Sequence, residues 1–151
     1  MPVLTLDAAV RDAVVAHARR DHPDEACGLI VGPAGSGRAE RVVEMVNAAR
    51  SMTQFEFEPG EQLRVYRELD DRDEEVVVVY HSHTATEAYP SRTDVRYASQ
   101  PEAHYLLVST RDPGAAEVRS YRIIEGTVTE EEVRVTGDSS GKPAAPAAVG
   151  P

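Results

Sequence analysis

Apolar residues recur along this chain at helical spacing, every three to four residues, in some segments and at every second residue in others. These two patterns predict an alternation of helices and strands. Helical spacing of apolar residues predicts a first helix over 7–20 with Asp7 as its cap, a second helix opened by Pro59 and Gly60, and a short third helix over 91–100. In the segment 55–58, apolar and acidic residues alternate with a period of two. Short apolar or alternating runs predict the strands 26–32, 41–47, 75–83, 104–110, 117–124 and 127–135, the last two as a hairpin.

The strongest predicted strand, 75–83, contains four consecutive valines followed by Tyr80. A run that is apolar on both faces is typical of a strand buried on both sides, as at the centre of an α/β sheet. From Gly137 onward the chain is mostly Gly, Ser, Pro and Ala, which can bury little surface. We therefore expect an α/β fold, one folded domain over 1–136 and a disordered tail over 137–151.

The negative net charge limits the kinds of molecule that the protein is expected to bind. The chain has 151 residues, with 26 Asp and Glu against 16 Lys and Arg, and a formal net charge of −10. Nucleic acids and anionic membrane surfaces are disfavoured, because phosphate binding needs an excess of Lys and Arg. No apolar stretch approaches the roughly 20 residues of a membrane span, and no secretory signal is visible. With Cys27 as the only cysteine, no intrachain disulfide can form, so a cytoplasmic location is expected.

Two sequence features could indicate a functional site, a glycine-rich segment and a cysteine, but a structural role explains each of them better. The glycines of 32–37 precede a β-rich run and lack the Gly-Lys-Ser/Thr of a phosphate-binding loop, so this segment is predicted to be a turn. Cys27 lies within the apolar run Cys-Gly-Leu-Ile-Val, where a small buried core residue is expected more often than a nucleophile.

The end of the valine-rich strand carries a candidate metal site. On a strand, His81 and His83 share one face at a spacing of roughly 6.5 Å, so both imidazoles can converge on one Zn²⁺. Ser91 and Asp94 follow after the next loop and supply a hydroxyl and a third ligand. Ser91-Arg-Thr-Asp94 is also a capping-box-like helix start, and both interpretations can hold together. Three protein ligands leave one position of a catalytic zinc open.

Metal-assisted hydrolysis also needs a general base to take a proton from water. Glu25 lies just before the buried strand at Ala26, and a solvated loop residue is the alternative interpretation. Spacing alone does not separate Glu25 from the other upstream acids, which are Asp24, Glu44, Glu56 and Glu58.

Glu25 with Cys27-Gly28-Leu29, followed by His81-x-His83-x₇-Ser91-x₂-Asp94, resembles the JAMM (MPN⁺) metalloprotease family, zinc enzymes that cleave bonds next to ubiquitin-like modifiers. Asn47 and Phe55-x-Phe57-x-Pro59 also look like this family. The resemblance implies a mixed sheet between helices, similar to cytidine deaminases. It implies that His81, His83 and Asp94 bind zinc, that Glu25 moves the proton, and that Ser91 donates a hydrogen bond to the oxyanion.

The loop 84–90 lacks the proline that many bacterial relatives carry directly after the second histidine, and looks like the small actinobacterial branch. That branch acts on a ubiquitin-like sulfur carrier protein and releases cysteine from the carrier's C-terminal adduct. The resemblance therefore implies a Gly-Gly tail as the partner segment, and a homodimer is possible in the family. Two alternatives stay open: a maturation protease that trims a short C-terminal extension, and a non-catalytic scaffold domain.

Overall fold

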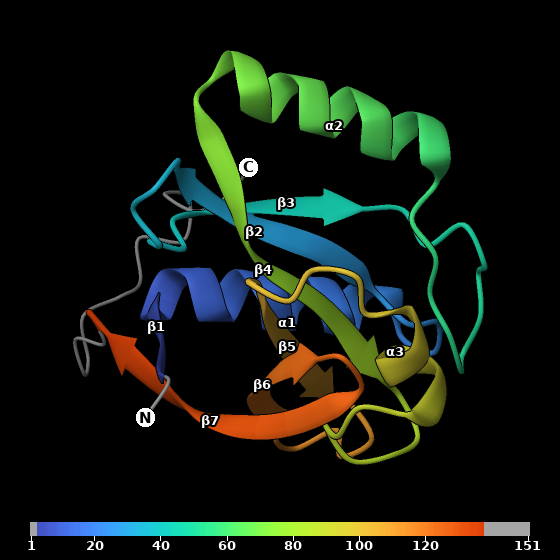
Figure 1. The fold of residues 1–151 in the computed structure, drawn as a ribbon. Helices are drawn as coiled ribbons and strands as arrows, with labels where there is room; N and C mark the ends of the chain where they lie inside the picture. Colours follow the sequence, from blue (N-terminus) through green and yellow to red (C-terminus); the bar gives the residue numbers. More distant parts are fainter. Residues whose placement is uncertain (1–2, 138–151) are drawn as a thin grey trace.

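The computed structural model describes residues 3–137, so the predicted tail lies outside the described residues apart from Gly137. Seven strands and three helices follow one another along this part of the chain (Figure 1). In order they are β1 (Val3–Asp7), α1 (Ala8–Asp21), β2 (Cys27–Pro33), β3 (Arg41–Met45), α2 (Pro59–Asp71), β4 (Glu74–His83), α3 (Arg92–Tyr97), β5 (His104–Ser109), β6 (Glu117–Ile124) and β7 (Thr127–Thr136). Among these residues, no helix is long and apolar enough to cross a membrane.

The strands form one mixed sheet in the order β1-β7-β6-β5-β4-β2-β3. The β1–β7 and β4–β5 pairs are parallel and the remaining neighbours are antiparallel. A parallel bridge between Leu6 and Ala39 brings the first strand to the chain just before β3, so the two edges of the sheet approach each other. The valine-rich strand β4 lies inside the sheet between β2 and β5, as its two apolar faces predict.

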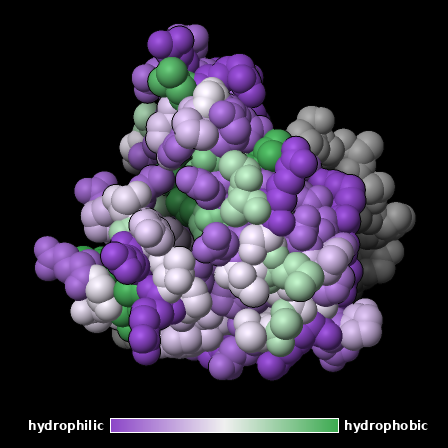
Figure 2. Space-filling view, turned by 90° about the vertical axis from the view of Figure 1, so that its right-hand side faces the viewer, coloured by the Kyte–Doolittle hydropathy of each residue, from purple (hydrophilic) through white to green (hydrophobic). Residues whose placement is uncertain are grey.

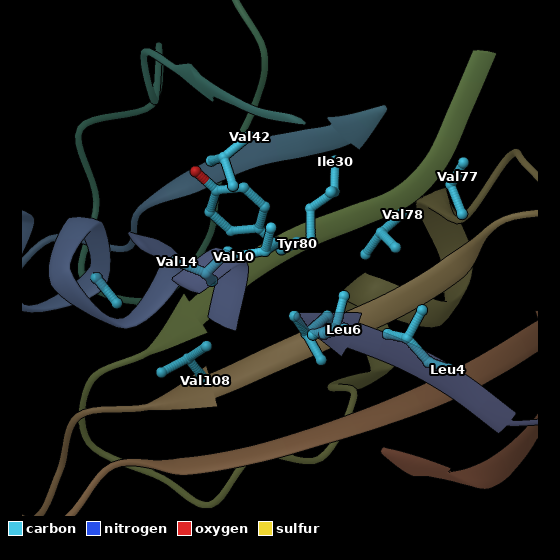
Figure 3. Packing of buried hydrophobic residues seen from close by; sticks show 12 residues of the cluster. Leu4, Leu6, Val10, Val14, Ile30, Val42, Val77, Val78, Tyr80 and Val108 are labelled. Atoms are coloured by element: carbon cyan, nitrogen blue, oxygen red, sulfur yellow. The ribbon is translucent and has the colours of Figure 1, made fainter. Parts of the chain in front are cut away.

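The inner layer of the core lies between α1 and the concave face of the sheet (Figure 1). Val10, Val14 and Ala18 recur every four residues, share one face of α1 and are buried. Tyr80 reaches from β4 toward Val42 and packs among these side chains (Figure 3). The helix thereby fills the curl of the sheet.

The outer layer covers the opposite face with α2, α3 and the loops beside them. Pro59 begins α2, and the Glu58 carboxylate accepts hydrogen bonds from the backbone N–H groups of Gly60 and Glu61. Cys27 is fully buried in this layer, and burial raises the pKa of its thiol to about 12, which confirms it as a core residue. The predicted α/β class, with a mixed sheet between helices, is confirmed.

One strand was not predicted, and two local predictions differ from the structure. The strand β1 was not predicted, because its pairing with β7 joins the two ends of the domain. The alternating segment 55–58 contributes one isolated bridge, from Phe57 to Asn47, and the ring centroids of Phe55 and Phe57 lie 5.7 Å apart. Asp7 lies at the cap of α1 but makes no side-chain capping bond, and the third helix ends at Tyr97 rather than at residue 100.

Candidate metal centre and active site

The end of β4 holds both histidines of the motif on the outer face of the sheet. His81 and His83 are buried, and Ser82 between them points the other way. The Ser82 backbone N–H donates to the Ala26 carbonyl at 3.0 Å, and its hydroxyl accepts from the Ala26 N–H at 2.8 Å. These two hydrogen bonds hold the end of β4, which carries both histidines, against the residue that precedes β2.

The third residue of the cluster comes from the start of α3. The Ser91 hydroxyl accepts from the Asp94 N–H at 3.0 Å, and the Asp94 carboxylate accepts from the Ser91 N–H at 2.8 Å. The capping box predicted from the sequence is therefore present. The same carboxylate oxygen lies 3.1 Å from His81 Nε2 and 3.0 Å from His83 Nε2. One residue thus starts the helix and completes the cluster.

The spacing of these three atoms fits a small tetrahedral cation. The two Nε2 atoms lie 3.3 Å apart, so all three separations fall between 3.0 and 3.3 Å. Two ligands bound to zinc at about 2.0–2.1 Å with a tetrahedral angle are roughly 3.3 Å apart. His81, His83 and Asp94 also form the only group of three or more His, Cys, Asp or Glu residues within metal-binding reach in residues 3–137.

The electrostatics of the cluster favour an ionised Asp94 carboxylate and shift the pKa values of the two imidazoles in opposite directions. Burial raises the pKa of Asp94, but hydrogen bonds with His81 and His83 outweigh it and hold that pKa well below its usual range. Burial lowers the pKa of His81 despite Asp94. For His83, burial also lowers the pKa, but Asp94 and the Glu87 carbonyl reverse the direction and raise it.

The two imidazoles are oriented by different neighbours. His83 Nδ1 lies 3.0 Å from the Glu87 carbonyl oxygen, which can only accept, so the ring carries its proton at Nδ1 and leaves Nε2 for a metal. His81 stacks on the ring of Phe55, with 4.4 Å between centroids. His81 Nδ1 is buried and has no hydrogen-bond partner among the described residues. Packing therefore orients His81, and a hydrogen bond orients His83.

Glu25 lies beside this cluster. Cys27 pairs with His81 in the antiparallel β2–β4 register, and the Ala26–Ser82 bonds continue it, which places Glu25 opposite His83 on the same face. Its side chain is buried, and Glu25 Oε1 has no hydrogen-bond partner among the described residues. Burial raises the pKa of Glu25 to about 8, with Asp94 adding to the shift and His83 opposing it.

The other four candidate acids lie in different surroundings, and Glu25 alone of the five is buried. Glu44 pairs with Arg20, and Glu58 caps α2. Asp24 is half-buried and Glu56 is exposed. The structure therefore brings one of the five acids into a buried position beside the histidines.

Asn47 connects Glu25 to the segment that carries Phe55. Its buried amide nitrogen donates to the carbonyls of Glu25 and Gln54, both at 3.0 Å. Its amide oxygen accepts from the N–H groups of Ala49 at 3.0 Å and Glu56 at 3.1 Å. Only the resemblance to the family singled out Asn47, because one asparagine in a loop forms no periodic pattern.

A groove of about 530 Å³ begins at the cluster and runs between α2 and α3. Its lining includes Phe55, Phe57, His81, Asp94, Tyr97 and Leu107. Figure 2 shows apolar side chains gathered in a hollow on this face of the molecule. Sequence reasoning did not identify Tyr97, whose side chain is 73% exposed at the rim, because a single exposed aromatic residue carries no pattern.

Residues 7–124 match the family described as prokaryotic homologs of the JAB domain. The chain belongs to this JAB family. The match spans α1 through β6 and so includes every residue of the cluster together with Glu25 and Ser91.

Curated relatives include proteins with named activities. The CysO-cysteine peptidase of Mycobacterium tuberculosis is 62% identical over 133 residues, which cover 88% of this JAB chain and 91% of that protein. The desampylase of Haloferax volcanii is 32% identical over 111 residues, covering 70% of this chain and 80% of that protein. The chain is thus a JAMM-type metallopeptidase by family.

Solved structures agree with the fold. A protein from Desulfitobacterium hafniense superposes with a TM-score of 0.78 and 33% identity, covering 89% of this chain and 93% of that one. A JAB1/MPN domain protein from Archaeoglobus fulgidus superposes with a TM-score of 0.54 at 17% identity, covering 87% and 98%. The second likeness concerns the fold alone.

Proposed function

We propose that this protein is a zinc-dependent peptidase that hydrolyses the amide between the C-terminus of a ubiquitin-like sulfur carrier protein and cysteine, and so releases cysteine. The observation that carries the proposal is the 62% identity, over 88% of the chain, to CysO-cysteine peptidases. The convergence of two imidazoles and one carboxylate within 3.3 Å supports it independently.

We assign zinc as the metal because a set of two histidines and one carboxylate, spaced for a tetrahedral ion, is typical of catalytic zinc sites. When bound, the metal supplies Lewis-acid activation of a carbonyl and of water. His81, His83 and Asp94 would hold it and leave one position open for substrate or water. A divalent cation at this place also favours the ionised form of the neighbouring Glu25, against the effect of burial.

The remaining roles fall to Glu25 and Ser91. The unpartnered carboxylate oxygen of Glu25 is free to accept a proton from water and to return it to the amine of the leaving cysteine. The Ser91 hydroxyl accepts the Asp94 N–H, so its own hydrogen remains available to a developing oxyanion. Both groups lie on backbone that is held by hydrogen bonds, which limits reorganisation during the reaction.

The groove between α2 and α3 suits a slender substrate segment. Its volume of about 530 Å³ and its apolar lining can accept an extended tail that ends at the cluster. A tail that finishes in glycines brings little side-chain bulk to the crowded ligands. The exposed ring of Tyr97 at the rim offers an apolar contact for the carrier beyond its tail.

Intact mass spectrometry tests the proposal directly. A carrier–cysteine adduct is incubated with the zinc-loaded protein, and we expect the carrier to lose the mass of one cysteine. Glu25→Gln and chelation should abolish the loss, whereas Glu44→Gln, at a half-buried acid paired with Arg20, should retain it. No loss with the wild type, or loss that survives Glu25→Gln, would contradict the proposal. A carrier with a short C-terminal extension, run in parallel, distinguishes cysteine release from maturation.

A further inference from the structure

The loop 84–90 has no helix or strand of its own, yet it determines the geometry of the cluster. It begins directly after His83 and ends at Pro90, directly before the Ser91 cap of the helix that carries Asp94. His81 and His83 lie on one strand, but the distances of 3.1 and 3.0 Å between their Nε2 atoms and the Asp94 carboxylate depend on this seven-residue irregular segment. An unsupported loop of this length samples many conformations, which would cost affinity for a metal.

The strand β6 binds the middle of this loop at Ala88. The Ala88 N–H donates to Glu117 Oε1 at 2.9 Å, and the Ala88 carbonyl accepts from the Tyr121 hydroxyl at 2.6 Å. Ala88 and Tyr121 are both fully buried. The ring of Tyr89 stands edge-on to Tyr121, with 5.4 Å between centroids. Both backbone polar groups of one loop residue are thus held by one strand.

The restraint reaches a metal ligand through the neighbouring residue. Glu87 precedes Ala88, and its carbonyl is the nearer of two groups at His83 Nδ1, at 3.0 Å, with the Thr86 hydroxyl at 3.3 Å. On the other side of Glu87, the Thr86 carbonyl accepts from the Ser109 hydroxyl at 2.5 Å. Glu87 is therefore held between two fixed residues, and its carbonyl cannot rotate away from His83 without breaking one of these contacts.

We infer that Tyr121 and Glu117 are positioning residues for the metal cluster, an inference that rests on the proposed function of that cluster. Neither residue contacts the ligand atoms. They act through Ala88, which fixes the Glu87 carbonyl and hence the orientation and proton position of His83. Partners of this kind usually change metal affinity by about 10–100-fold when removed. Because Tyr121 acts one residue further away, we expect the lower end of that range.

The test measures Zn²⁺ affinity by competition with a chelator, in the absence of any carrier. Tyr121→Phe removes one hydroxyl, and Glu117→Ala removes the acceptor of the Ala88 N–H at a position with 37% side-chain exposure. Each should weaken zinc binding about 10-fold. Glu117→Gln keeps an acceptor oxygen and should bind zinc as the wild type does. Turnover should fall with zinc affinity in the two weakened variants, with KM little changed.

Tyr80→Phe is the matched control. It also removes a buried tyrosine hydroxyl, one that hydrogen-bonds His17 on the opposite face of the sheet at 2.7 Å. It should lower the melting temperature and leave zinc affinity unchanged. If Tyr121→Phe and Glu117→Ala bind zinc within two-fold of the wild type, the inference is wrong. It is equally wrong if Tyr80→Phe weakens zinc as much as they do, or if Glu117→Gln is as weak as Glu117→Ala.

The outcomes separate this inference from the proposed function. Weakened zinc binding in the β6 variants, together with no cleavage of the carrier adduct by the wild type, would leave the positioning role intact and reject the substrate. If Tyr121→Phe does not fold, the two Glu117 variants decide the question, because that side chain is partly exposed and its replacement leaves the core unchanged.

Discussion

Replacing Asn47 with alanine removes four hydrogen bonds at once from the segment next to Glu25. Asn47 is the only asparagine of the chain, and its side chain satisfies two carbonyls and two N–H groups at 3.0–3.1 Å. At about 1 kcal/mol for each bond, the free energy of unfolding should fall by about 4 kcal/mol. Asn47→Asp keeps the acceptor oxygen but directs a buried carboxylate oxygen at two carbonyls, so it should cost at least as much.

The functional effect should differ from the effect on stability. With the Glu25 carbonyl released, the carboxylate loses its defined position opposite His83, and kcat should fall in both variants while KM changes little. Urea unfolding gives the free energies, and steady-state cleavage at a temperature where both variants are folded gives kcat.

Two results would refute this reasoning. A loss of less than about 1 kcal/mol in Asn47→Ala would mean that water or neighbouring groups replace the four bonds without cost. A folded Asn47→Asp with wild-type kcat would mean that the backbone of Glu25 is held by the sheet alone.

Three further predictions concern single contacts. Ser91→Ala should lower kcat by about 10²–10³-fold and the free energy of unfolding by about 1 kcal/mol, since the hydroxyl is both the proposed oxyanion donor and a helix cap. Steady-state kinetics and thermal unfolding measure the two effects. An unchanged kcat would reject the donor role. Gly28→Ala should lower the free energy of unfolding by about 1–3 kcal/mol, because the new Cβ would overlap the buried ring of Tyr80. Urea unfolding measures this loss, and a variant as stable as the wild type would contradict the close packing. Burial raises the pKa of Glu131, but hydrogen bonds with His104 and Ser120 outweigh it and lower the pKa below its ordinary 4.5. The ionised Glu131 therefore adds stability that is complete above pH 4.5 and is lost as the pH falls through the lowered pKa. Glu131→Gln should make the free energy of unfolding less dependent on pH in this acid range. An unchanged pH dependence would contradict the prediction.

The motif residues could be predicted because their relationships are local. His81 and His83 share a face through the two-residue period of a strand, and Ser91 and Asp94 are joined by the three-residue period of a capping box. Four consecutive valines likewise indicated a strand in the interior of the sheet, which β4 is. Resemblance then added Glu25, which spacing could not separate from four other acids.

Other parts of the site depend on residues that meet only in the folded chain. Glu25 is set apart from the competing acids by burial, which follows from the β2–β4 register. Tyr121 lies 33 residues from Ala88, and Asn47 lies 22 residues from Glu25. Neither residue belongs to a repeating pattern, so nothing in the linear order distinguishes it from other tyrosines or polar loop residues.

The sequence by itself determined the elements other than β1, the α/β class and the spacing of the candidate metal motif, because periodicity and short spacing act within a few residues. The tertiary structure alone decided that β1 closes the sheet against β7, that Glu25 is buried beside His83, and that β6 holds the loop between the ligands. The physical reason is that burial and long-range hydrogen bonds depend on which strands become neighbours. That choice is made by the whole core rather than by any one segment.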